Sequence, residues 1–90
     1  YNTDMLSLAG ATAAISDQVW LRDNVSKVRN TRARMESELQ ALGFNVLPSH
    51  ANFVWCTRQD RPVKPIYDSL KQRGILVRYM NYPRWSDGLR

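Results

Sequence analysis

Cysteine and histidine are scarce in this sequence, with Cys56 and His50 the single representatives of their types in 90 residues. A lone cysteine cannot form a disulfide within the chain, which excludes a disulfide-stapled scaffold and fits a reducing compartment, so we expect a cytoplasmic protein. His50 has no second histidine, spaced cysteine or suitably placed acidic residue, so a zinc site is unsupported. We expect a structural or solvent-exposed role for His50 and a buried, unreactive thiol at Cys56.

Long apolar runs and common catalytic motifs are also missing. No stretch approaches the ~20 apolar residues that cross a bilayer, and no charged-then-apolar leader is present, so we expect no membrane partner. There is no glycine-rich phosphate loop, no GxSxG motif and no carboxylate pair at a telling spacing. Because the sequence begins on Tyr1 rather than on methionine, we expect it to be part of a longer protein.

The net charge of +5 is carried by one end of the sequence. Residues 1–60 hold six basic and six acidic side chains, which cancel. Residues 61–90 hold seven basic side chains against two acidic ones: Arg61, Lys64, Lys71, Arg73, Arg78, Arg84 and Arg90 against Asp68 and Asp87. A basic and aromatic segment of this kind keeps a nucleic-acid-binding module open as an alternative function.

Two helices are predicted in the first half of the chain. One helix is predicted at residues 4–14, with Asn2, Thr3 and Asp4 as possible capping residues. Its Ala/Gly-rich face predicts close packing against a neighbouring element. Residues 17–42 carry an apolar stripe of period 3 to 4, with Ser16 or Asp17 as a possible cap and Gly43 as a stop. At 1.5 Å per residue this second helix is about 39 Å long, about as long as a domain of this size is wide.

The second half alternates between strand and helix patterns. Residues 61–74 have helical spacing, with Pro62 or Pro65 tolerated in the first turn and Gly74 as a stop. Short β-branched and aromatic runs predict strands at 44–48, 51–57 and 75–80, and "SDGLR" predicts a turn into a truncated fourth strand.

This order, ααββαβ(β), predicts an α+β fold: a small mixed or antiparallel sheet of three to four strands with helices on one face, preceded by a long helix. We expect residues 1–42 to be linking and long helices and residues 43–90 to form the small α/β core.

Two groups of arginines stand out in the sequence. Arg29, Arg32 and Arg34 are most simply a solvated helix face, although Arg32 interrupts the apolar stripe, so that either the stripe twists past it or its side chain snorkels. Arg78 lies in an otherwise apolar strand, and alternation places it opposite to Val77 and Tyr79. Together with Arg90 it could grip a carboxylate or a phosphate through paired N–H donors, or both could be solvent-facing charges at a sheet edge.

Several stretches are similar to one enzyme family: "YNTDMLSLAGATAAI" before "VRNTRARMESELQALGF", then "PSHANFVW", "LKQRGILVRYM" and "DGLR". In combination they resemble the small domain of the fold-type I, class I/II aminotransferases that use pyridoxal phosphate, and most closely the histidinol-phosphate aminotransferase group. The resemblance covers nearly all of the chain.

The resemblance implies a reversible amino transfer in which the pair glutamate and 2-oxoglutarate exchanges an amino group with the pair histidinol phosphate and imidazole acetol phosphate, its keto form, a step of histidine biosynthesis. It implies that Arg90 holds the substrate carboxylate and that Arg78 helps to bind the phosphate. The cofactor, pyridoxal 5'-phosphate, would be held by a large domain outside this sequence, so Lys27, Lys64 and Lys71 are not expected to bind it, and the 90 residues alone should be inactive. A homodimer is implied for the whole enzyme.

Arg84 and Trp85 match no feature of the family. Because of these two residues, aminotransferases of the same class that act on aspartate, aromatic amino acids or threonine phosphate stay open as alternative functions. An autonomous regulatory or scaffolding domain is a further alternative.

Overall fold

The computed structural model describes residues 2–90, and these residues form three helices and a four-stranded antiparallel sheet in the order α1, α2, β1, β2, α3, β3, β4. The predicted α+β class and element order are therefore confirmed. The chain divides into two compact units, one up to Asn30 and the other from Thr31 to Arg90. None of the helices within residues 2–90 is both long and apolar enough to cross a membrane.

Helix α1, Met5–Ser16, begins at a side-chain cap. Asp4 has extended backbone dihedral angles, and its Oδ1 accepts the backbone N–H of Ser7 at 2.9 Å, as expected of an N-cap aspartate. The Ser7 hydroxyl and N–H bonds to this carboxylate lower the pKa of Asp4. Every residue of α1 is exposed, so the close packing predicted for its Ala/Gly face is not made within this unit.

Helix α2, Gln18–Ala41, has the predicted length and the predicted end signals. The Asp17 carboxylate accepts a backbone N–H of the first turn at 3.0 Å. At the other end Gly43 takes the left-handed conformation with φ 84°, and the Phe44 N–H donates to the Leu39 carbonyl at 3.0 Å. This is the bond of a Schellman motif, in which glycine avoids the strain that a Cβ would cause.

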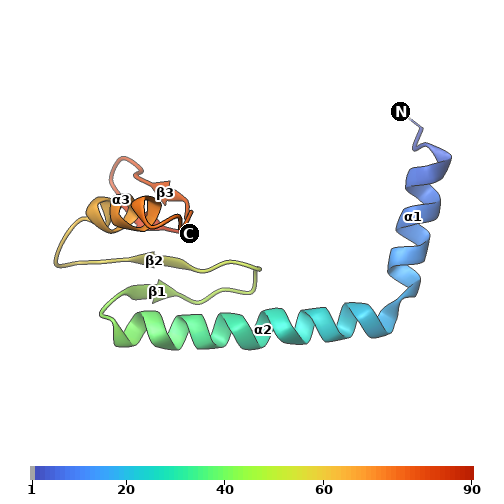
Figure 1. Cartoon of the computed structure of the whole chain (residues 1–90), viewed down its shortest axis with the longest axis horizontal. Helices are drawn as coiled ribbons and strands as arrows, with labels where there is room; N and C mark the ends of the chain where they lie inside the picture. The colour runs from blue at the N-terminus through green and yellow to red at the C-terminus, as the bar shows by residue number, and fades with distance from the viewer. Residues whose placement is uncertain (1) are drawn as a thin grey trace. The chain divides into compact units, whose positions relative to one another are not determined.

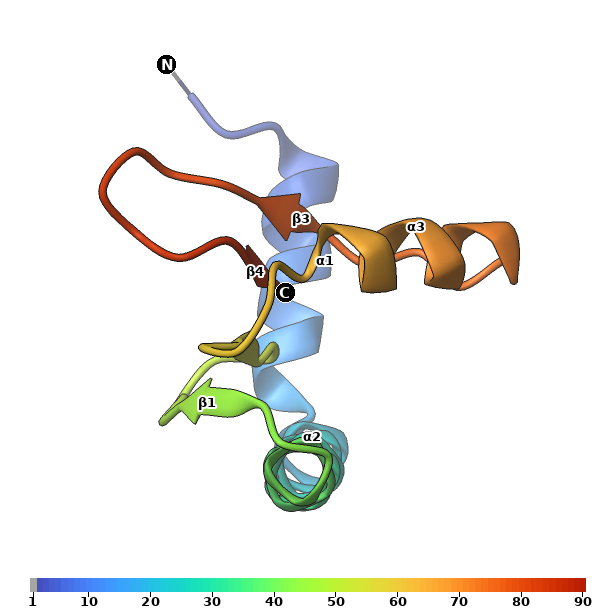
Figure 2. The same cartoon turned by 90° about the vertical axis from the view of Figure 1, so that its left-hand side faces the viewer.

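The sheet has the strand order β1-β2-β4-β3, and every neighbouring pair is antiparallel. Its strands are short: β1 Asn45–Leu47, β2 Trp55–Thr57, β3 Tyr79–Met80 and β4 Gly88–Leu89. Helix α3, Lys64–Gln72, connects β2 to β3, and in Figures 1 and 2 β1 lies beside the C-terminal turns of α2. One of the two central strands, β4, is thus supplied by residues 88–89.

One face of the sheet carries the core. Val46, Cys56 and Leu89 are aligned across β1, β2 and β4 by the register and are all buried. Val54 and the fully buried Val63 complete the cluster. Half-buried side chains of α2, α3, β3 and the connecting segments pack against it: Leu39, Phe44, Ile66, Tyr67, Val77 and Tyr79. Helix α3 and the C-terminal turns of α2 therefore cover this face, in agreement with the predicted sheet with helices on one face.

Two predicted strands are shorter than expected. Of residues 51–57 only 55–57 form a strand, because 51–53 bend around the Ser49 hydroxyl. Of residues 75–80 only 79–80 are assigned to a strand, because the partner β4 is itself two residues long and Ile75 N–H still bonds to the Leu70 carbonyl behind it. Strand propensity alone cannot extend a strand beyond its partner.

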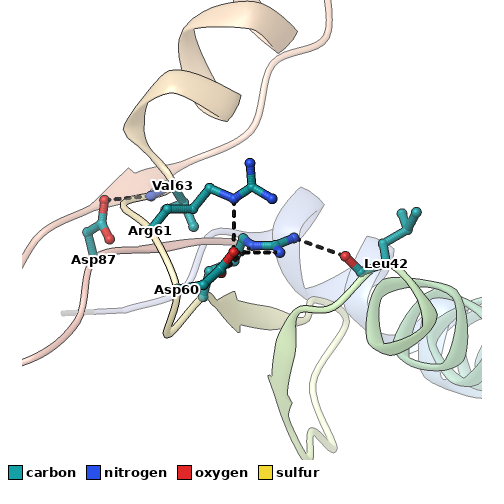
Figure 3. Close-up of polar contacts among 6 residues, drawn as sticks. Leu42, Asp60, Arg61, Val63 and Asp87 are labelled. Atoms are coloured by element: carbon teal, nitrogen blue, oxygen red, sulfur yellow. Dashed lines mark hydrogen bonds and ion pairs between the residues drawn. The ribbon is translucent and has the colours of Figure 1, made fainter.

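Two polar anchors tie the loops of this unit together (Figure 3). Asp87 accepts the N–H of Val63 at 3.0 Å, which joins the residue before β4 to the start of α3. Arg58 donates to the Leu42 carbonyl at 2.9 Å and to Asp60 at 2.8 Å, which joins the end of β2 to the end of α2. The Arg58 bond lowers the pKa of Asp60 from 3.8 to about 2.

Candidate functional site

Arg78 and Arg90 are partners in the β3–β4 ladder. The Arg78 N–H donates to the Arg90 carbonyl at 3.0 Å, and the Arg90 N–H donates to the Arg78 carbonyl at 2.8 Å. This reciprocal exchange continues the register Tyr79↔Leu89 by one residue and defines a directly opposed, hydrogen-bonded pair. Side chains of such a pair leave the same face of the sheet with Cβ atoms roughly 5 Å apart. The structure therefore brings the two predicted arginines together.

The face of the sheet that carries these arginines is opposite to the core. Tyr79 and Leu89 pack into the core, so the residues next to them along each strand point to the other side. Arg78 and Arg90 are both exposed, which agrees with the alternation that the sequence predicted around Val77 and Tyr79. We call this side the arginine face.

The arginine pair has no acidic partner among residues 2–90. The ion pairs of this part of the chain join Arg32 to Glu36, Arg58 and Arg61 to Asp60, and Lys64 to Asp68. Like charges directly opposite each other on a sheet destabilise it. An anion bound between the two guanidinium groups would remove that repulsion and accept their paired N–H donors. The arrangement is suited to a carboxylate or a phosphate.

Phe53 is a site residue that the sequence analysis did not identify. The guanidinium carbon of Arg90 lies over the Phe53 ring, 4.9 Å from its centroid, within the range of a cation–π contact. Phe53 belongs to "PSHANFVW", in a run for which the sequence predicted only a strand. No signal in the sequence links it to Arg90, because the contact depends on the bend at 51–53.

A pocket of about 360 Å³ lies farther along the arginine face. It is lined by Trp55 of β2, by Met80 of β3, and by Tyr82 and Trp85 of the loop that joins β3 to β4, together with Asn45, Leu47, Thr57 and Ser86. Neither Arg78 nor Arg90 lines this pocket. The pocket is therefore an apolar neighbour of the arginine pair and not its binding cavity.

The loop between the two arginine-bearing strands projects from the sheet away from α3 (Figure 2). Its only positive-φ residue other than glycine is Arg84, at φ 70°, a conformation that costs a non-glycine residue some strain. Trp85 is 78% exposed, and its backbone N–H donates to the Tyr82 carbonyl at 3.1 Å. The structure thus exposes the two residues, Arg84 and Trp85, for which the sequence offered no explanation.

The other candidate residues behave as the sequence predicted, with one exception. Cys56 is buried at the centre of the sheet, and burial raises the pKa of its thiol. His50 is exposed. The exception is Arg32, which neither snorkels nor is simply passed by the stripe: it is half-buried and donates to the Ala51 carbonyl at 2.6 Å. Its place in the apolar stripe is explained by that bond.

The three lysines do not form a cofactor site. A pyridoxal phosphate site needs a lysine amine and a carboxylate for the pyridine nitrogen in one cavity. Lys64 pairs with Asp68 and lies over the Tyr67 ring, while Lys27 and Lys71 are exposed on α2 and α3. None of them lines the pocket on the arginine face. Lys27, Lys64 and Lys71 are therefore not placed as a pyridoxal phosphate site requires.

Comparison with known proteins adds an independent finding. The family model described as "Aminotransferase class I and II" matches residues 1–90. Over its whole length the chain is 53% identical to a histidinol-phosphate aminotransferase of Rhodopirellula baltica and 47% identical to one of Syntrophotalea carbinolica. It spans 25% and 26% of the lengths of these two enzymes. No solved structure gives a significant match.

Proposed function

Since the chain belongs to the class I and II aminotransferase family, we propose that it is the small-domain part of an enzyme that transfers an amino group between glutamate or 2-oxoglutarate and histidinol phosphate or imidazole acetol phosphate, a step of histidine biosynthesis. The names of its relatives, at up to 53% identity, support this substrate pair. The family match favours amino transfer over the nucleic-acid-binding alternative. Because the chain spans about a quarter of those relatives, activity is a property of the whole protein.

The opposed placement of Arg78 and Arg90 carries the proposal. Arg90 binds the carboxylate of the amino-acid substrate through its planar fork of N–H donors, and Arg78 binds the phosphate of histidinol phosphate. Both side chains leave a rigid hydrogen-bonded ladder, so little ordering is needed on binding. Holding the anion at a constant place fixes the direction in which the substrate amine points.

The cofactor supplies the electron sink for amino transfer when it is bound, and enzymes of this family use pyridoxal 5'-phosphate. We assign it to the part of the protein outside these 90 residues, because Lys27, Lys64 and Lys71 do not fit it. The contribution of this chain is then to bind and orient the substrate. The chain by itself should show neither transamination nor the visible absorbance of bound cofactor.

The remaining assignments concern the whole enzyme. Residues 43–90 form the core of its small domain and residues 1–42 lead into it, with Leu39 of α2 packed on that core. Its partners are small anionic metabolites and a second copy of the chain, rather than nucleic acid or membrane. A cytoplasmic location is supported by the single, unpaired Cys56.

The test is a pair of conservative substitutions in the full-length enzyme. Arg90→Lys should raise KM for glutamate roughly 10- to 100-fold, because a point charge cannot replace a charge-assisted fork. Arg78→Lys should act mainly on KM for histidinol phosphate. Cofactor absorbance should stay unchanged in both, and Arg61→Lys, on the same unit but paired with Asp60, serves as a control.

Two outcomes would contradict the assignment. Equal losses of substrate binding and cofactor loading in Arg90→Lys would show that Arg90 does not act on substrate. A substrate panel decides between acceptors, because faster turnover of aspartate or an aromatic amino acid than of histidinol phosphate would identify another member of the same class.

A further inference from the structure

Arg90 is exposed and faces another arginine, yet one face of its guanidinium is covered. The Phe53 ring lies 4.9 Å from the guanidinium carbon. Without such a contact, a flexible and exposed arginine opposite a like charge would turn away from it. Stacking on an aromatic face uses the flat side of a guanidinium and leaves the N–H donors in its plane free. The contact therefore restrains Arg90 without consuming the donors that a carboxylate needs.

The position of Phe53 is itself set by three hydrogen bonds to the bend at residues 51–53. The Ser49 hydroxyl accepts the Ala51 N–H at 3.1 Å and donates to the Phe53 carbonyl at 2.8 Å. From α2, Arg32 donates to the Ala51 carbonyl at 2.6 Å. These bonds close the bend at 51–53 on both sides, so the Phe53 ring is presented by ordered backbone.

We infer that Phe53 is a positioning residue for substrate binding: its ring holds the Arg90 guanidinium in the orientation that receives a carboxylate, and Ser49 with Arg32 holds Phe53. The inference rests on the proposed function of Arg90. It explains why residues 51–53 form a bend in place of the expected strand and why Arg32 interrupts the apolar stripe of α2.

The chain contains a matched control for this contact. Arg58 lies over the Phe44 ring at 5.1 Å from its centroid, which is the same type of stack, and Arg58 is occupied by Asp60 and the Leu42 carbonyl. Replacing Phe44 by leucine removes an equivalent ring from the same unit without touching Arg90.

The experiment uses the full-length enzyme and the substitutions Phe53→Leu, Phe53→Tyr and Phe44→Leu. Phe53→Leu should raise KM for glutamate roughly 3- to 30-fold, the effect of losing a cation–π contact, with kcat changed less than about twofold. Phe53→Tyr keeps the ring and should restore KM to within about twofold. Phe44→Leu should leave KM unchanged, and cofactor absorbance should be unchanged in all three.

A double-mutant cycle separates this inference from the proposed function. If Phe53 acts through Arg90, Phe53→Leu should have no further effect on KM in an Arg90→Lys background. If Arg90→Lys alone does not raise KM, the function proposed for Arg90 fails. If Arg90→Lys raises KM but Phe53→Leu does not, or does so equally in both backgrounds, only the positioning role is overturned.

Ser49→Ala provides a second route should Phe53→Leu fail to fold. Removing the hydroxyl frees the Phe53 carbonyl and the Ala51 N–H, so KM for glutamate should rise in the same direction, by a smaller factor than for Phe53→Leu. An unchanged KM for a folded Ser49→Ala enzyme would contradict the role of the Ser49 hydrogen bonds in holding Phe53. If Phe53→Leu could not be measured, the same result would also contradict the positioning role of Phe53.

Discussion

The indole of Trp55 occupies the place where a side chain at Gly88 would begin. A Cβ built on Gly88 would lie 2.2 Å from Trp55 Cζ2, closer than any real contact of that kind. The two residues stand on adjacent strands, β2 and β4. Gly88 does not have a positive φ, so its role here is to admit the ring and not to relieve the backbone. Close approach explains the glycine of "DGLR", which leads directly into Arg90.

Gly88→Ala should therefore destabilise the enzyme by about 1–3 kcal/mol, the usual cost of overpacking. Urea unfolding of the full-length protein measures this change. In a Trp55→Val background the ring is absent, and the same substitution should cost much less. A cost that is equal in both backgrounds would show that Trp55 is not the obstacle.

Asp87 should be needed as a hydrogen-bond acceptor rather than as a charge. Its carboxylate accepts the N–H of Val63, which is fully buried before α3. Asp87→Ala should lower the free energy of unfolding by about 1–2 kcal/mol, whereas Asp87→Asn, which keeps an acceptor oxygen, should lose less than half of that. Asp68→Ala, which removes an exposed partner of Lys64, should stay within about 0.5 kcal/mol. Identical losses for alanine and asparagine at residue 87 would contradict this role.

Asp60 should make stability depend on pH in the acid range. Its hydrogen bond with Arg58 lowers its pKa from the ordinary 3.8 to about 2, so the folded state binds the proton less readily than the unfolded state. The stabilisation that ionised Asp60 gives the folded state is therefore present at pH values above the ordinary pKa of 3.8, and it is lost as the pH falls through the lowered pKa of about 2. The difference in urea midpoint between the natural protein and Asp60→Asn should be constant near pH 5 and shrink steadily below about pH 4.

The result for Asp60 can be checked from the other partner. In an Arg58→Gln protein the carboxylate loses its main hydrogen bond and keeps only the pairing with Arg61, so Asp60→Asn should change the pH dependence much less than in the natural protein. An effect of Asp60→Asn that is equally large in the Arg58→Gln background would show that Arg58 is not the cause of the lowered pKa of Asp60.

Cys56 should resist alkylation while the protein is folded. It is buried in the middle of the sheet, and burial raises the pKa of its thiol, which lowers the fraction of reactive thiolate near neutral pH. Mass spectrometry of the Cys56 peptide after iodoacetamide treatment should show little modification in native enzyme and full modification in urea. Rapid labelling of the native protein would mean that the strand β2 opens easily.

Much of the fold could be predicted from local signals. Asp4, Asp17, Gly43 and Gly74 mark the helix ends because caps and left-handed glycines act over a few residues. The strands were located but their lengths were not, since a strand extends only as far as its partner. The bend at 51–53 was missed because the Ser49 hydroxyl competes there with the ladder for backbone bonds.

The sequence by itself determined the element order, the family, and the two arginines most suited to bind an anion. Only the tertiary structure decided that Arg78 lies opposite Arg90, that Phe53 stacks on one of them, and that Trp55 covers Gly88. The physical reason is register: strand pairing joins residues far apart in the chain, and a slip of one residue would have turned each arginine to the core face. Periodicity identifies the face of a strand, but only pairing identifies the neighbour.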